Sequence, residues 1–141
     1  MESIREYLKQ NILLFDGAMG TYYAECTGDG GICESANINN PDLIKKIHIE
    51  YIDAGAKAIL TNTFAASSDF FINDRKLQKD MIMSGIDIAA FAAKGKDIYI
   101  FGDIGPVNAE NENAAFKEYK IIVDIFLEKG MFSQELLEAP T

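Results

Sequence analysis

The sequence contains few of the residues on which several common kinds of site depend. It has two cysteines, Cys26 and Cys33, and a single histidine, His48, among its 141 residues. Two cysteines are too few for the disulfide framework of a small secreted domain. They are seven positions apart, whereas zinc-binding cysteines usually pair at about two to four, with a second pair or histidines downstream. We therefore expect free thiols in a reducing cytosol.

The single histidine also limits the catalytic chemistry of the chain. A Ser/His/Asp or Cys/His arrangement uses a histidine as its base, and one histidine leaves little room for such a site. His48 lies between Ile47 and Ile49, in a segment of helical periodicity. We expect it to be a packed or partly exposed helix residue rather than a metal ligand or a base.

Positive charge and long apolar runs are scarce as well. The chain has 13 Lys and Arg against 22 Asp and Glu, a net charge of −9. Nucleic acids and anionic membrane surfaces are bound through Lys and Arg, so neither is expected as a partner. No apolar run approaches the ~20 residues that cross a bilayer, and residues 1–6 are acidic where a signal peptide would be basic. We expect a cytoplasmic protein with one domain.

What the sequence does contain is a repeated order of helix and strand. Short apolar runs at 12–15, 58–60 and 98–101 predict buried parallel strands. Helical periodicities are predicted over 4–10, from 41 to Gly55, from 77 to Gly95 and from 116 to Gly130, and a polar loop over 21–40. This alternation is typical of an α/β fold, a parallel sheet with helices packed outside it.

Polar residues and turn formers follow each predicted strand. They are Asp16, Thr61, Asn62, Thr63, Asp103 and the pair Gly105-Pro106. Because chemistry in parallel sheets collects at the carboxyl ends of strands, these residues predict a shared functional rim. Strands must also end in something polar, so ordinary loop chemistry is the alternative.

The segment DGAMGT at 16–21 allows three interpretations. A phosphate loop for a nucleotide would need a third glycine, a helix directly after it and an acidic residue at the end of the second strand. The second strand ends instead in Thr61-Asn62. A tight turn that uses glycine for its backbone geometry is the second interpretation. Backbone N–H groups exposed toward a small carboxylate are the third.

A series of short motifs resembles the homocysteine S-methyltransferase domain, the homocysteine-binding barrel of cobalamin-dependent methionine synthases and their relatives. The motifs are LLFDGAMGT at 13–21, ESAN at 34–37, NPD at 40–42, EYIDAGA at 50–56, TNTFAAS at 61–67 and GDIGP at 102–106. They occur in order at three successive strand ends, and the likeness spans about residues 4–130.

The resemblance implies a (β/α)₈ TIM barrel that transfers a methyl group to the thiol of homocysteine, yielding methionine. Members of this family hold a zinc ion through three cysteine thiolates, and the zinc keeps the substrate sulfur deprotonated and nucleophilic. The resemblance assigns substrate binding to Asp16, Gly17, Ala18, Met19, Gly20, Asn62, Thr63 and Phe64. It leaves the methyl donor open among methylcobalamin supplied by methyltetrahydrofolate, S-methylmethionine, S-adenosylmethionine and betaine.

The sequence departs from the family in its length and its cysteines. A (β/α)₈ barrel needs ~250 residues, and the family's zinc cysteines lie on late strands, so Cys26 and Cys33 do not match them. We therefore interpret residues 1–130 as the first three strand-helix units of an incomplete barrel, with an irregular tail at 131–141. We expect no metal ligands and no catalytic residues in this chain, inactivity alone, and possible self-association through open barrel edges. The alternative is a non-catalytic α/β binding or assembly module.

Overall fold

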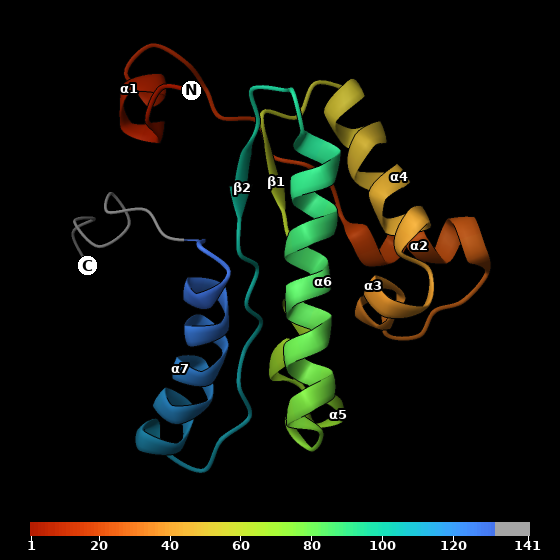
Figure 1. Ribbon diagram of the computed structural model, residues 1–141, viewed down its shortest axis with the longest axis vertical. Helices are drawn as coiled ribbons and strands as arrows, with labels where there is room; N and C mark the ends of the chain where they lie inside the picture. Colours follow the sequence, from red (N-terminus) through yellow and green to blue (C-terminus); the bar gives the residue numbers. More distant parts are fainter. Residues whose placement is uncertain (132–141) are drawn as a thin grey trace.

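The computed structural model describes residues 1–131 and has an α/β fold with a small parallel sheet (Figure 1). Strand β1 (Ala58–Leu60) pairs in parallel with β2 (Tyr99–Phe101), with Ile59 opposite Ile100. Phe15 forms a parallel bridge to Ala58 on the other edge of β1. The three predicted strands therefore lie side by side in chain order, and the predicted α/β class is confirmed. The predicted tail lies, from residue 132 on, outside the described residues.

The first predicted strand, 12–15, is wrong in its extent and its burial. Only Phe15 has a bridge, although Leu14 O accepts hydrogen bonds from the N–H groups of Lys57 and Ala58 at 2.8 and 3.0 Å. Ile12 is 90% exposed and Leu14 56%. A strand whose side chains are apolar on both faces is buried only when other elements pack against both faces of the sheet. Among residues 1–131, this segment pairs along one edge alone.

The helices flank the sheet and fill the connections between its strands. The longer ones are α2 (Met19–Thr27), α4 (Pro41–Asp53), α6 (Arg75–Ala93) and α7 (Glu112–Glu128). The shorter ones are α1 (Ile4–Leu8), η1 (Cys33–Ser35), α3 (Ala36–Asn39), η2 (Phe64–Ser67) and α5 (Asp69–Ile72). The predicted ends at Gly55, Gly95 and Gly130 are confirmed, since all three have positive φ.

The predicted loop at 21–40 is wrong, because most of it is helical. It contains most of α2, together with η1 and α3. No residue of α2 is buried, so this helix carries no apolar stripe by which the sequence could reveal it. The consequence for the site is that the glycine segment at 17–20 leads directly into a helix.

Helices α4 and α6 cover one face of the sheet. Ile59 packs there with Ile52, Ala89 and Ala92. A second cluster joins α6 to α7 through Met81, Ile82, Ile122 and Phe126. The opposite face of the sheet carries the rings of Phe15 and Phe101, whose centroids are 5.0 Å apart. Phe15 is 42% exposed, so this inner face is open in the described part of the chain.

The sequence predicts helix α7 from Phe116, Tyr119, Val123, Phe126 and Leu127, and of these only Phe126 is buried. Ile122, Ile125 and Phe126 are its buried residues. Phe116 and Leu127 are 67% and 45% exposed. The helix therefore has two apolar faces, and only one of them is packed against α6.

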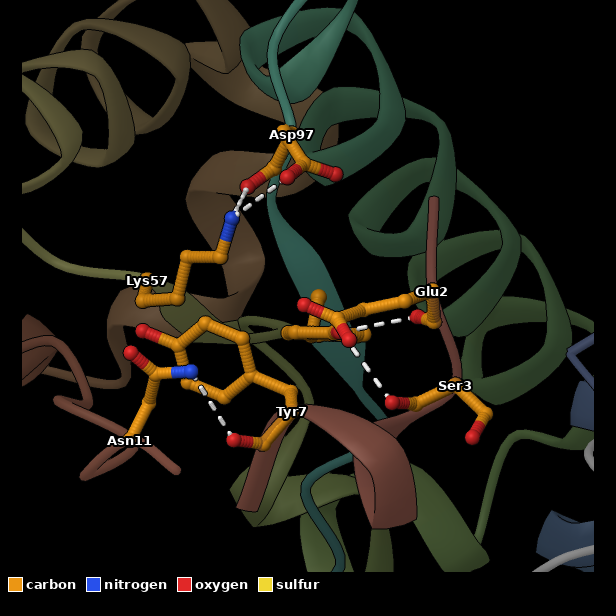
Figure 2. A network of polar contacts seen from close by, with 7 residues as sticks. Glu2, Ser3, Tyr7, Asn11, Lys57 and Asp97 are labelled. Carbon is orange, nitrogen blue, oxygen red and sulfur yellow. Dashed lines mark hydrogen bonds and ion pairs between the residues drawn. The ribbon is translucent and has the colours of Figure 1, made fainter. Parts of the chain in front are cut away.

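Helix α1 is anchored at the amino-terminal end of β2 by a small polar and aromatic network (Figure 2). The Tyr99 hydroxyl donates to the Glu2 carbonyl oxygen at 2.8 Å, and the rings of Tyr7 and Tyr99 meet edge to face. Lys57 lies over both rings and pairs with Asp97 at 2.7 Å. This network is at the end of the sheet opposite the predicted rim. No helix within residues 1–131 is long and apolar enough to span a membrane.

Candidate functional site

A cavity of about 260 Å³ lies at the carboxyl ends of the strands. All eight residues that the sequence predicts for substrate binding line it. These are Asp16, Gly17, Ala18, Met19, Gly20, Asn62, Thr63 and Phe64. Cys33, Glu34, Leu60, Thr61 and Asp103 complete the lining. Polar residues predicted at three successive strand ends therefore meet around one space, whereas the predicted rim pair Gly105-Pro106 lies outside its lining.

The first wall of the cavity is the loop that joins Asp16 to α2. Asp16 N–H donates to Ala58 O at 3.0 Å, and Asp16 Oδ2 accepts from Leu60 N–H at 3.2 Å, so this residue is fixed to β1 by backbone and side chain. Ala18 is the N-cap of α2 and has no side chain that could accept from the helix N–H groups. The N-terminal backbone of α2 therefore faces the cavity without a side-chain cap.

The second wall of the cavity is formed by the residues that follow β1 and β2. A ring of hydrogen bonds joins these two strand ends. Asp103 N–H donates to Thr61 Oγ1 at 3.1 Å, and the two threonine hydroxyls are 2.7 Å apart. Thr63 Oγ1 donates to the Asp103 carbonyl oxygen at 2.7 Å and closes the ring. Both threonines are buried. Their hydroxyls are thus used to join the strands, and their role at the cavity is to fix its shape.

Asn62 is held by a second buried network that reaches into α3 and η1. Its Nδ2 donates to Asn37 Oδ1 at 2.9 Å and to Cys33 O at 3.1 Å, and its Oδ1 accepts from Cys33 Sγ at 3.3 Å. Asn37 Nδ2 donates in turn to Asn62 O at 2.7 Å and to Met81 O at 3.1 Å. A Cβ at Gly85 would come within 2.7 Å of Asn37 Nδ2. The network therefore also requires glycine in α6.

Glu34 is a site residue to which the sequence analysis assigns no role. Its side chain is buried, Oε1 accepts from Ala65 N–H at 3.1 Å, and Oε2 lies 3.5 Å from Cys33 Sγ. A single acidic residue between Cys33 and Ser35 has no periodicity that predicts its burial. The only sequence signal is its place in the ESAN motif, which supports the family resemblance but predicts no contact or chemical role for Glu34.

The cavity is acidic, and its carboxyl groups are poorly solvated. Burial raises the pKa of Asp16 to about 6, and the nearby Asp103 adds to the rise. Burial, followed by repulsion from Glu34, raises the pKa of Asp103 as well. Asp16 Oδ1 is buried and has no hydrogen-bond partner among residues 1–131. No Lys, Arg or His among residues 1–131 lines this cavity. It therefore presents carboxylates that a positively charged group would stabilise.

The described residues do not fit a zinc ion. Residues 1–131 contain no cluster of three or more His, Cys, Asp and Glu side chains that could hold a metal. Burial and the charge of Glu34 raise the pKa of Cys33 to about 12, and its thiol donates to Asn62 Oδ1 at 3.3 Å within the buried network. Cys26 is exposed and lies outside the cavity lining.

Comparison with known proteins gives matches along most of the chain. The family model for homocysteine S-methyltransferase matches residues 13–134. The methionine synthase of Mycobacterium tuberculosis is 32% identical over 142 residues, which cover 89% of this chain and 12% of that protein. The homocysteine S-methyltransferase of Escherichia coli is 30% identical over 116 residues, or 72% of this chain and 37% of that protein.

A solved structure shares the fold. The crystal structure of the homocysteine methyltransferase MmuM from Escherichia coli, in its metallated form, superposes with a TM-score of 0.76 at 22% identity. The superposition covers 90% of this chain and 54% of that chain, so the present chain spans about half of the solved chain. The family model takes in the cavity's three strand ends and most of the sequence. The chain therefore belongs to the homocysteine S-methyltransferase family.

Proposed function

We propose that this chain forms the homocysteine-binding wall of a methyl-transfer barrel. The observation that carries the proposal is the acidic cavity at the strand ends, because all eight predicted residues line it and the described part of the chain places no basic side chain there. Homocysteine is a zwitterion with a thiol. An ammonium group fits beside Asp16 and Asp103, and a carboxylate fits the uncapped N-terminus of α2, where the helix dipole favours negative charge.

The roles of the residues follow from their hydrogen bonds. Asp16 has a free buried oxygen and is proposed to accept from the substrate ammonium. Gly17, Ala18, Met19 and Gly20 supply backbone N–H groups toward the carboxylate. The side chains of Asn62 and Thr63 are already hydrogen-bonded within the protein, so we assign them the role of fixing the shape of the cavity. Phe64 is 53% exposed and lies at the mouth of the cavity.

Methyl transfer itself is proposed to need more than this chain. In the complete domain we expect zinc to hold the substrate sulfur as a thiolate, with its ligands and the methyl-donor site outside this chain. Since Cys33 does not fit that role, we derive no step through zinc here. The chain alone is therefore expected to bind homocysteine and to transfer no methyl group.

Exchange of Asp16 for Asn tests the proposal. We expect D16N to weaken homocysteine binding at least tenfold, measured by calorimetry at pH 7.5, because the ammonium loses a charged acceptor. In the natural chain the affinity should also fall below pH 6, where Asp16 is protonated. The analogue 4-mercaptobutanoate has a carboxylate but no ammonium group, so its binding should weaken with neither change.

The matched control is D53N, since Asp53 is exposed at the end of α4 and outside the cavity. It should bind homocysteine as the natural chain does. If the natural chain shows no binding at millimolar homocysteine, the non-catalytic module is the better interpretation, and if D16N binds normally, our assignment of the ammonium is wrong.

We also propose that two copies of the chain associate through their open sheet edges. Strand polar groups alternate between edges, so the backbone of Ile100 points away from β1, as does that of Phe15 on the other side. Each edge strand therefore presents backbone N–H and C=O groups that can form hydrogen bonds with an edge strand of a second copy. Exposed apolar residues lie near them, including Ile12, Leu14 and Leu127.

Sedimentation equilibrium tests this association. We expect a dimer whose dissociation constant falls as salt is raised, because each copy carries a net charge of −9 and salt screens their repulsion. Replacement of Leu14 by Lys should shift the chain toward monomer. A compact monomer at high concentration and high salt would exclude the proposal.

A further inference from the structure

We propose that Tyr51 is a positioning residue for the homocysteine site, which it serves by holding the loop between Asp16 and α2 from behind. The inference depends on the proposed function in one respect: the loop matters because homocysteine binds against it. Tyr51 itself lies outside the cavity lining. It acts from α4, a helix on the outer side of the sheet (Figure 1).

Two contacts join Tyr51 to the loop. Its hydroxyl donates to the Ala18 carbonyl oxygen at 2.9 Å. Its ring lies so close to Gly17 that a Cβ there would be 2.7 Å from Tyr51 Cε1. A side chain at position 17 would therefore displace this ring, and the hydrogen bond falls on the N-cap residue of α2.

Tyr51 approaches the loop from the side opposite to the substrate cavity. It lines a separate hollow of about 340 Å³ with Ala18, Thr21, Tyr22 and Glu25. Ala18 lines both the cavity and the hollow, so it separates the two spaces. Asp16 ties one end of the loop to β1, and Tyr51 ties the middle to α4. Together they fix the distance between the Asp16 carboxylate and the N-terminus of α2.

The tether keeps its donor proton across the physiological range. Burial, and then the negative charge of Asp16 and Glu25, raises the pKa of the Tyr51 hydroxyl. An ionised Asp16 therefore keeps the Tyr51 hydroxyl protonated. Preorganisation of this kind raises affinity because the loop loses less conformational freedom when the ligand binds.

Exchange of Tyr51 for Phe removes the hydroxyl and keeps the ring. We expect Y51F to bind homocysteine about fivefold more weakly, the effect of one net hydrogen bond. We also expect faster hydrogen exchange, measured by NMR, at the amides of Asp16 and Leu60, whose hydrogen bonds hold this loop to β1. A merely structural role would lower the melting temperature without a selective change at these amides.

The matched control is Y22F. Tyr22 contacts the Tyr51 ring edge to face at 5.8 Å, but its own hydroxyl binds Glu50. Y22F should leave both the homocysteine affinity and the exchange at Asp16 and Leu60 as in the natural chain.

The outcomes separate the two proposals. If the natural chain does not bind homocysteine, the proposed function fails, whereas faster loop exchange in Y51F alone still supports the tether. If the natural chain binds and Y51F binds equally well, Tyr51 does not position the site. Equal losses in Y51F and Y22F would also overturn the inference, because they would assign the effect to the aromatic pair.

Discussion

Replacement of Asn37 by Ala is expected to destabilise the chain by about 2 to 4 kcal/mol. The side chain is buried on α3 and joins three parts of the molecule through its amide. Its loss removes the donor to Asn62 O and Met81 O and the acceptor for Asn62 Nδ2. Buried polar groups that are left without partners destabilise the folded state by their full desolvation free energy. The missing side chain also leaves a cavity, which lowers stability further.

Urea unfolding followed by circular dichroism measures this effect. The control is Asn39→Ala, which makes the same chemical change on the same short helix at an exposed position. It should change the free energy of unfolding by less than about 0.5 kcal/mol. Because Asn62 lines the cavity, N37A should also weaken homocysteine binding. A loss of stability in N37A no larger than in N39A would show that the network contributes little.

The sequence predicts the helices and strands that pack on the sheet better than it predicts which apolar segments are buried. Helices α4 and α6 are predicted because their apolar residues recur at helical spacing and pack on β1 and β2. The same reasoning fails for α2, which has no buried residue, and for the segment at 12–15, where none of the apolar residues is buried. Hydrophobicity predicts where burial is possible, but burial also needs a second surface, and that surface is not a property of the segment itself.

The site shows the same division. Its eight predicted residues meet because the carboxyl ends of parallel strands share one edge, a geometric consequence of the strand order. The burial of Glu34 and the amide network of Asn37 could not be predicted, since both depend on how η1 and α3 pack against residues far along the chain. The sequence therefore predicts which strand ends carry the site, and the structure adds which of their side chains are free to bind.

His48 is expected to make the stability of the chain depend on pH. Its side chain is fully buried, and neither ring nitrogen has a hydrogen-bond partner among residues 1–131. Burial lowers its pKa from 6.5 to about 4. Between these two values the unfolded chain binds the proton and the folded chain does not, so stability falls as the pH falls. The full loss, reached below pH 4, is about 3 kcal/mol.

Asp16 acts in the opposite direction over much of the same range. Its pKa is raised from 3.8 to about 6, so between these values the folded chain holds the proton and the unfolded chain has lost it. Its contribution is therefore present at low pH and is lost as the pH rises through 6. Asp103, whose pKa is also raised, adds to this opposing trend. The natural chain should thus show a flatter dependence on pH than His48 alone would give.

Two variants separate the contributions. D16N should be more sensitive to acid than the natural chain between pH 6 and 4, because the opposing carboxyl is gone. His48→Leu replaces an unpartnered ring by an apolar side chain of similar size, so it should be at least as stable at pH 7 and more resistant to acid. Urea unfolding at pH 4.5, 5.5 and 7 measures both. If H48L and the natural chain lose stability equally on acidification, His48 is solvated or paired in solution, and the acid sensitivity of this fold has its origin in other groups.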